Sequence, residues 1–256
     1  MLNERQSIEV FHLLFLHVFG ARVDRSLYVL KGGCNLRFYC KSIRYSEDMD
    51  LDVRTVAVNT LRKNVEWVLA APAFVQGLRA QGLALQAFTA PKQTETTQRW
   101  KLIIRGAQGR DLPTKIEFSR RKLDAGRELQ PGDPEILRRY GLYPVLVQHY
   151  GMDSAFQQKV AALARRNETQ ARDMFDLKLL LDQGARPDAR NIFDSGKTLL
   201  PRAVENGLSI GYDQFAGQVL AYLEPEYQDH YRPRKVWESL QAEVVQQLVR
   251  LESLGS

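Results

Sequence analysis

Four acidic residues lie within the six-residue stretch EDMDLD, and three of them, Asp48, Asp50 and Asp52, alternate with apolar residues. Strict alternation is typical of a β-strand, in which residues two apart point to the same face. The three carboxylates therefore share one face, while Met49 and Leu51 point to the other, towards a core. Carboxylates this close repel one another unless a cation lies between them, and carboxylate oxygens suit Mg²⁺. The stretch predicts a strand that holds magnesium.

A glycine pair follows the apolar run 26–31, about a dozen residues before the acidic strand. The run predicts a strand, Gly32 and Gly33 predict a tight turn that brings backbone close to a ligand, and residues 34–41 predict a short helix. A helix N-terminus favours phosphate. A phosphate cradle and a metal strand together suit phosphoryl transfer, which needs a held triphosphate and a neutralised charge. Each half alone is usually structural, but the ordered combination is much more specific.

A third carboxylate is a candidate for the same site. Residues 114–119 predict another alternating strand, with Ile116 and Phe118 towards the core and Glu117 on the other face. If this strand lies beside the Asp48 strand, Glu117 is a third metal ligand. The alternative is a solvated glutamate on an edge strand.

A charged group is also expected on two helices of the second half. Asp173 and Asp176 lie three apart and share a helix face, near Lys159 and three arginines at 165, 166 and 172. An inward lysine can hold a triphosphate as a point charge, and an inward aspartate can orient it. Ordinary interhelical salt bridges are the alternative.

Composition limits the classes of partner. The chain has 256 residues, 36 basic against 30 acidic, for a net charge of +6, which permits a nucleic-acid partner without demonstrating one. Basic clusters at 120–122 and 165–166 are candidates for RNA contacts. The two cysteines and four scattered histidines indicate neither a disulfide framework nor a catalytic triad. The apolar run 8–19 is too short to span a bilayer, so we expect a cytoplasmic protein without membrane contact.

The pattern of elements predicts an α+β fold, with an α/β domain over residues 1–125 and a mainly helical domain over 126–256. The composition shifts near 124–134, which contains two glycines and two prolines. We expect strands at 48–54, 83–89 and 99–104, with the polar segment PKQTETTQ as a loop or hairpin connection between the last two. We expect helices at 3–20, 57–71, 73–81, 154–166, 170–183, 198–206, 212–224 and 233–252.

Two stretches resemble motifs of one family. The sequence KGGCNLRF…RYSEDMDLDV resembles the KGG-T-A-L-R and R-x-S-x-D-x-D-L patterns of the AbiEii/AbiGii toxin nucleotidyltransferases, of the DNA polymerase β-like superfamily. Residues 159–177, KVAALARRNETQARDMFDL, resemble that family's second motif, a lysine followed by arginines and R-D-x-x-D-L. The two motifs come in the family's order and span residues 27–181.

The resemblance implies a nucleotidyltransferase core with a mixed sheet, followed by a helical domain that closes the active-site cleft. It implies transfer of NMP from an NTP to an acceptor. In characterised relatives of the MenT type, this acceptor is the 3′ end of tRNA. It also implies a toxin of a toxin–antitoxin or phage-defence module, with a cognate antitoxin as partner.

The resemblance also implies roles for residues. Asp48 and Asp50 match the metal-binding aspartates, with Glu117 as third ligand and two Mg²⁺ ions expected; Lys159 and Asp173 complete the predicted catalytic set. The predicted nucleotide contacts are Gly32, Gly33, Cys34, Arg44, Ser46, Lys159 and Asp176. Cys34 departs from the family's threonine or serine, which replaces a hydroxyl by a weak thiol donor. Asp52 is either a spectator or a helper of its neighbours.

Three other functions stay open at this point. In the first, the acceptor is a protein or small-molecule hydroxyl rather than tRNA. In the second, the chain is an NTP-binding module without catalysis. In the third, it is a structural helical protein with an acidic surface strand. Mg²⁺-dependent release of pyrophosphate separates the first from the others.

Overall fold

The computed structural model describes residues 2–106, 108–120, 123, 126–188, 192–194 and 197–255. The chain divides into two compact units. The first contains Met1–Lys41 and Tyr45–Tyr150, and the second contains Ser42–Arg44 and Gly151–Ser256.

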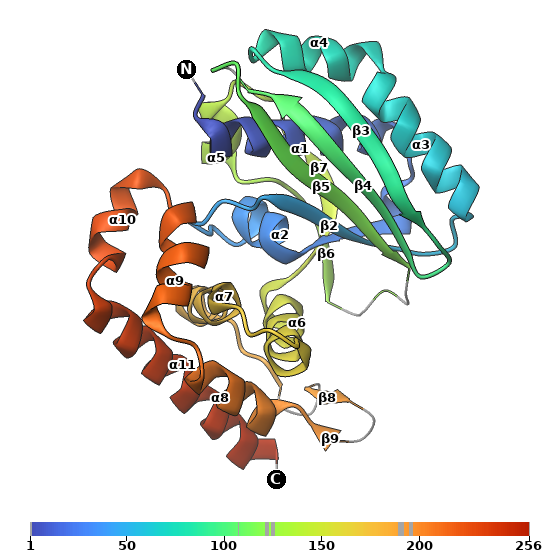
Figure 1. Cartoon of the computed structure of the whole chain (residues 1–256). Coiled ribbons are helices and arrows are strands. Elements are labelled where there is room, and N and C mark those ends of the chain that lie inside the picture. The colour runs from blue at the N-terminus through green and yellow to red at the C-terminus, as the bar shows by residue number, and fades with distance from the viewer. Residues whose placement is uncertain are drawn as a thin grey trace. The chain divides into compact units, whose positions relative to one another are not determined.

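Helices of the first unit cover one face of its sheet (Figure 1). The first helix begins with a capping box, in which the side chain of Asn3 accepts from the backbone of Gln6 and the Gln6 side chain accepts from the backbone of Asn3. The helices are α1 (Glu4–Arg22), the 3₁₀ turn η1 (Arg25–Leu27), α2 (Gly32–Tyr39), α3 (Val58–Ala70), α4 (Pro72–Ala80) and α5 (Pro134–Arg139).

A seven-stranded mixed sheet, in the order β3-β4-β5-β2-β1-β7-β6, forms the first unit. Strand β2 lies between β1, its antiparallel partner, and β5, its parallel partner. The strands are β1 (Tyr28–Lys31), β2 (Asp48–Val53), β3 (Ala84–Gln93), β4 (Thr97–Arg105), β5 (Asp111–Arg120), β6 (Arg127–Pro131) and β7 (Leu146–Tyr150). The predicted pairing of the Asp48 strand with the Glu117 strand is therefore confirmed.

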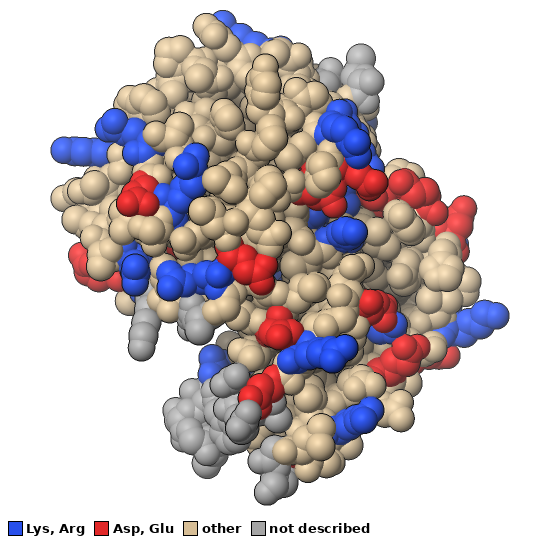
Figure 2. Space-filling model, turned by 180° about the vertical axis from the view of Figure 1, so that it is seen from behind, with Lys and Arg blue, Asp and Glu red and all other residues tan. Residues whose placement is uncertain are grey.

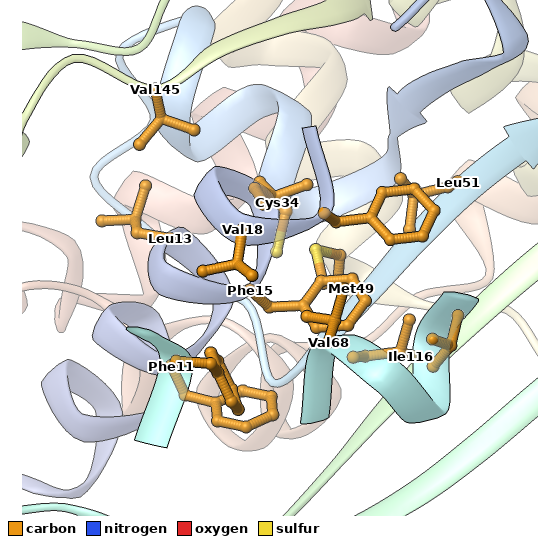
Figure 3. Close-up of a cluster of buried hydrophobic side chains, with 14 of the residues drawn as sticks. Phe11, Leu13, Phe15, Val18, Cys34, Met49, Leu51, Val68, Ile116 and Val145 are labelled. Atoms are coloured by element: carbon orange, nitrogen blue, oxygen red, sulfur yellow. The ribbon is translucent and has the colours of Figure 1, made fainter. Parts of the chain in front are cut away.

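The core of the first unit lies between the sheet and helices α1, α3 and α4. Alternation along β2 and β5 puts Met49, Leu51, Ile116 and Phe118 into this core, where each is fully buried. Figure 3 shows Met49, Leu51 and Ile116 among apolar side chains of α1 and α3. Burial of one face leaves the other face of the same strands for polar side chains, as the alternation predicted.

The second unit is helical apart from a short hairpin, β8 (Phe193–Asp194) with β9 (Lys197–Thr198). Residues 43–44 belong to it by backbone contacts, because Glu224 N–H donates to the carbonyl of Ile43 at 3.0 Å and Arg44 pairs with Leu223. Its helices are α6 (Met152–Arg165), α7 (Ala171–Asp182), α8 (Leu200–Leu208), α9 (Tyr212–Gln218), the 3₁₀ turn η3 (Leu220–Tyr222), α10 (Pro225–Tyr231) and α11 (Arg234–Gly255). The predicted fold class, α+β followed by helices, is confirmed.

Two sequence predictions of local structure were wrong, and a third was right only in part. The polar segment PKQTETTQ is the hairpin connection between β3 and β4, one of its two expected forms, but only 94–96 lie outside the strands, because the edge strand β3 tolerates Pro91. The glycine pair is the first turn of α2 rather than a turn before it. The helix expected at 212–224 ends at Gln218, because residues 223–224 are extended where they pair with 43–44.

The division between the units falls at residue 150 rather than 125. Strand β7 pairs with β1 and β6 pairs with β7, so both belong to the sheet of the first unit. In the part of the chain that the structure describes, no helix has the length and apolar character that crossing a membrane requires.

Candidate active site

The start of α2 lies against the acidic strand β2. Lys31, the last residue of β1, is the cross-strand partner of Asp50. Gly32 has a φ of +67°, and a Cβ atom there would lie 3.0 Å from Oδ2 of Asp50. Among the described residues, no side chain caps the first turn of α2. The backbone N–H groups of Gly33 and Cys34 are therefore suited to bind an anion beside a carboxylate pair.

Strand β5 brings further charges to the same face of the sheet. Asp48 is opposite Lys115, and their charged atoms lie 3.0 Å apart. Asp50 is opposite Glu117, whose carboxylate accepts from Nε of Arg99 at 2.6 Å. The structure thus places Glu117 beside Asp50, as predicted, but its carboxylate is bound to an arginine.

The charges around Asp50 suit a cation. Burial raises the pKa of Asp50; Lys115 and Lys31 oppose this rise, and the carboxylates of Glu117 and Asp48 add to it. A carboxylate with a raised pKa beside two more carboxylates gains from any added positive charge. Within the described ranges, no three His, Cys, Asp or Glu side chains are grouped so that they could hold a metal ion. The carboxylates of Asp48 and Asp50 are two donors, and Mg²⁺ is a cation that takes one or two carboxylates and leaves positions for phosphate oxygens.

Asp52 lies on the same face as Asp48 and Asp50 but is 2% exposed. Its carboxylate is 2.5 Å from Nζ of Lys31 and accepts from the hydroxyl of Tyr150 at 2.9 Å. Lys31 also donates to Ser119 at 3.0 Å. Asp52 therefore fixes the lysine that immediately precedes the glycine pair, and the sequence contains no signal for this contact beyond the alternation.

The Cys34 thiol lies in the interior, away from the solvent-facing side of the turn. Its sulfur is 3.4 Å from Nδ1 of His12 and 3.3 Å from the carbonyl of Asp48, and the side chain is fully buried. Burial raises the pKa of the thiol well above its ordinary value. The predicted phosphate contact of Cys34 is therefore open to its backbone N–H only.

His12 joins three parts of this site and was not predicted. Its Nε2 lies 2.9 Å from Thr114 Oγ1, and Thr114 donates to the carbonyl of Glu47 at 2.6 Å. Burial lowers the pKa of His12 to about 3, so the ring is neutral. Because Thr114 donates its proton to Glu47, the neutral His12 ring donates through Nε2 and carries no proton at Nδ1.

The two residues of the R-x-S motif, Arg44 and Ser46, belong to different units. Ser46 donates to the carbonyl of Asp48 at 2.8 Å and so supports the start of β2. Arg44 belongs to the second unit, where Nη2 lies 2.9 Å from Oδ2 of Asp176.

The second predicted motif comes together inside the second unit. Lys159 lies between the two aspartates, 3.1 Å from Asp173 and 2.6 Å from Asp176, and both carboxylates are fully buried. Arg166 also binds Asp173, at 2.8 Å. Burial acts to raise the pKa of Asp176, but Arg44 and Lys159 outweigh it and hold this pKa below its ordinary value. The three cations and two buried carboxylates form one network that fixes the ammonium group of Lys159, with Arg166 at its exposed edge.

The two basic clusters contribute less free charge than their sequence implies. Arg166 is bound to Asp173, and Arg120 donates to Gln98 at 2.9 Å and to the carbonyl of Val56. The other members of the cluster 120–122, residues 121 and 122, lie outside the described residues.

Comparisons with known proteins give the family and the fold. The model of the family described as nucleotidyl transferase AbiEii toxin, type IV TA system, matches residues 14–244. MenT4, a nucleotidyltransferase toxin from Mycobacterium tuberculosis H37Rv, has a similar structure, with a TM-score of 0.62 and 17% identity over 98% of this chain and 93% of that one. JHP933 from Helicobacter pylori gives a TM-score of 0.59 and 18% identity over 98% and 95%.

No curated protein matches the sequence. At these identities the solved structures support the fold, and the family follows from the model that spans nine-tenths of the chain. The chain therefore belongs to the AbiEii family of nucleotidyltransferase toxins of type IV toxin–antitoxin systems.

Proposed function

We propose that this nucleotidyltransferase moves an NMP from an NTP to the 3′ end of tRNA in a Mg²⁺-dependent reaction. It would act in the cytoplasm as the toxin of a toxin–antitoxin or phage-defence module, with an antitoxin as its protein partner. The observation that supports this most directly is the contact between the start of α2 and the Asp50 carboxylate. A phosphate-binding turn and a carboxylate pair in direct contact suit a metal-bound triphosphate.

The candidate site residues of the first unit have the following proposed roles. Asp48 and Asp50 hold magnesium, with two ions proposed, and Glu117 is the third ligand. The N–H groups of Gly33 and Cys34 bind phosphate. When bound, magnesium neutralises charge on the triphosphate and helps to activate the attacking hydroxyl. Asp52 holds Lys31 in place, so a positive charge stays beside the glycine turn.

Lys159 and Asp173 are proposed catalytic residues through the resemblance of their motif, and Arg44 and Asp176 are proposed to support them. The buried contacts of Lys159 with Asp173 and Asp176 favour this role, because they hold its ammonium group in one position. Preorganised charge stabilises a transition state without reorganisation during the reaction.

A labelled-transfer assay tests the proposal. The protein is incubated with Mg²⁺, each of four α-labelled NTPs and total tRNA, with parallel reactions in EDTA. Asp48→Ala removes a proposed ligand, and Asp111→Ala is the matched control, because Asp111 is an exposed aspartate at the far end of β5. We expect label on tRNA with the wild type and Asp111→Ala, and none with Asp48→Ala or EDTA.

The other outcomes identify what is wrong. Label on protein or on a small molecule, with no label on RNA, would keep the enzyme and reject the acceptor. NTP binding without transfer to any acceptor would support a non-catalytic module.

A further inference from the structure

The polar face of the sheet continues beyond the carboxylates as a line of basic residues. On β5, Lys115 is opposite Asp48 on one side and Lys101 of β4 on the other. In the next register position, Arg99 lies between Glu117 of β5 and Lys92 of β3. Cross-strand partners point to the same face. We call Lys92, Arg99, Lys101 and Lys115 the basic row.

Two pairs of like charges lie on this face, and over the residues that the structure describes only one member of each pair is bound to an opposite charge: Lys115 to Asp48, and Glu117 to Arg99. Lys101 and Lys115 are directly opposite, and so are Asp50 and Glu117, and like charges in this position destabilise a sheet. Lys92 and Lys101 are exposed, and within the described part of the chain neither has a carboxylate partner. The acidic pair gains from a bound cation, and by the same reasoning the basic row gains from a bound anion.

A net charge of +6 does not say where on the surface such a place lies. Over the face that Figure 2 shows, Lys and Arg are interspersed with Asp and Glu, and neither sign covers a large continuous area. The basic row is distinguished by its register, which joins it directly to the carboxylates of β2.

The order of the strands separates two anion sites. The start of α2 follows β1, on one side of β2, while the basic row lies on β5, β4 and β3, on the other side. The triphosphate is assigned to the α2 side. A second polyanion that reaches Asp48 and Asp50 from the β5 side is the acceptor. Lys101 lies two strands from Asp48, or about 10 Å at the usual spacing of strands, which corresponds to about three stacked nucleotides.

We propose that the basic row binds the phosphate backbone of the acceptor RNA, next to the carboxylates at which its 3′ hydroxyl reacts. This inference rests on the proposed function, because it takes RNA as the acceptor. It assigns the basic row to binding the acceptor RNA and not to binding the NTP.

Equilibrium binding to tRNA, measured without NTP across a range of salt concentrations, tests the row. The variant is Lys92→Ala/Lys101→Ala. The matched control is Lys63→Ala/Arg79→Ala, which removes the same charge from exposed positions on α3 and α4, the helices on the other face of the sheet. Lys92→Arg/Lys101→Arg keeps the charge. Thermal unfolding checks that each variant is folded.

We expect the alanine variant to bind tRNA about ten-fold more weakly, with a slope of log K against log salt shallower by about 1.4, as two lost contacts to a single strand predict. The control and the arginine variant should bind as the wild type does. The KM for the NTP should not change.

Three results would overturn the inference: no binding of tRNA by the wild type, an equal loss in the Lys63/Arg79 control, or a higher KM for the NTP with unchanged RNA affinity. A failure of the proposed function has a different signature. If RNA binding depends on Lys92 and Lys101 but no label reaches RNA in the transfer assay, the binding surface stands and the proposed acceptor is rejected.

Discussion

A Cβ atom at Gly32 would lie 3.0 Å from Oδ2 of Asp50, a distance that real Cβ contacts essentially never fall below. Two separate reasons therefore favour glycine at this position: its φ of +67°, and the close approach of the Asp50 carboxylate. The two reasons can be tested separately, because other glycines of the unit have a positive φ but no atom within 4 Å of an added Cβ.

Gly32→Ala should lower kcat/KM by about 100-fold, because the added methyl displaces Asp50 from its position beside the turn proposed to bind phosphate. It should also cost about 1–2 kcal/mol of stability, as alanine in the left-handed region does. The labelled-transfer assay and denaturant unfolding measure the two effects.

Gly141→Ala is the matched control for that prediction. Gly141 has a φ of +61°, and a Cβ there would meet nothing within 4 Å. It should show a similar loss of stability with wild-type activity. Equal losses of activity in both variants would mean that backbone strain, rather than the contact with Asp50, explains the effect.

Asp50→Asn should raise the stability of the metal-free protein at pH 7 while lowering activity by about two orders of magnitude or more. The substitution removes a partly buried charge that faces Asp48 and Glu117, and it also removes a proposed metal ligand, whose loss should cost several kcal/mol in the transition state. Thermal unfolding in EDTA and in Mg²⁺ measures the effect on stability: Mg²⁺ should stabilise the wild type and not the variant.

Asp111→Asn, at an exposed position, is the control and should change neither stability nor activity. An Asp50→Asn variant that is less stable than the wild type in EDTA would contradict this prediction.

The part of the site that is local in sequence could be predicted. Alternation alone placed Asp48 and Asp50 on one face and Met49 on the other, because strand geometry has a fixed period of two. The same reasoning failed for β6, whose residues are all exposed and therefore show no alternation. Sequence patterns report burial, and an edge strand with neither face buried leaves no pattern.

Apart from the pairing of the Asp48 and Glu117 strands, the contacts between distant segments of the site could not be predicted. His12, Cys34 and Thr114 meet although 22 and 102 residues separate the contacting pairs. Arg44 and Asp176 are 132 residues apart, and the pairing of 43–44 with 223–224 decides that they meet. No spacing rule covers such pairs, since the packing of whole elements sets them.

His12 should make the protein less stable in acid in a defined range. Its pKa falls from 6.5 to about 3 on folding, so below pH 6.5 the unfolded chain binds a proton that the folded chain does not. The free energy of unfolding should therefore decrease by about 1.4 kcal/mol per pH unit as the pH falls from 6.5 towards 3. Denaturant unfolding at several pH values measures this slope.

The comparison that isolates this histidine is His12→Gln against His17→Gln, since His17 is exposed on the same helix. His12→Gln should flatten the pH dependence, and His17→Gln should leave it unchanged. A wild-type slope in His12→Gln would show that other groups carry the effect.

Asp176→Ala should destabilise the protein by about 3–5 kcal/mol, because it removes the fully buried carboxylate that binds two buried cations, Arg44 and Lys159, and leaves Lys159 with Asp173. Asp182→Ala is the matched control on the same helix: its carboxylate is 56% exposed and binds Lys178, so its loss should cost less than about 1 kcal/mol.

The stabilisation that Asp176 contributes should depend on pH in a way that identifies it. Its pKa is lower in the folded chain than the ordinary 3.8, so its stabilisation is complete above pH 3.8 and is lost as the pH falls through the folded value. The stability difference between wild type and Asp176→Ala should therefore be constant near neutral pH and shrink in strong acid. Equal losses in Asp176→Ala and Asp182→Ala at pH 7 would show that the buried network does not hold the second unit together.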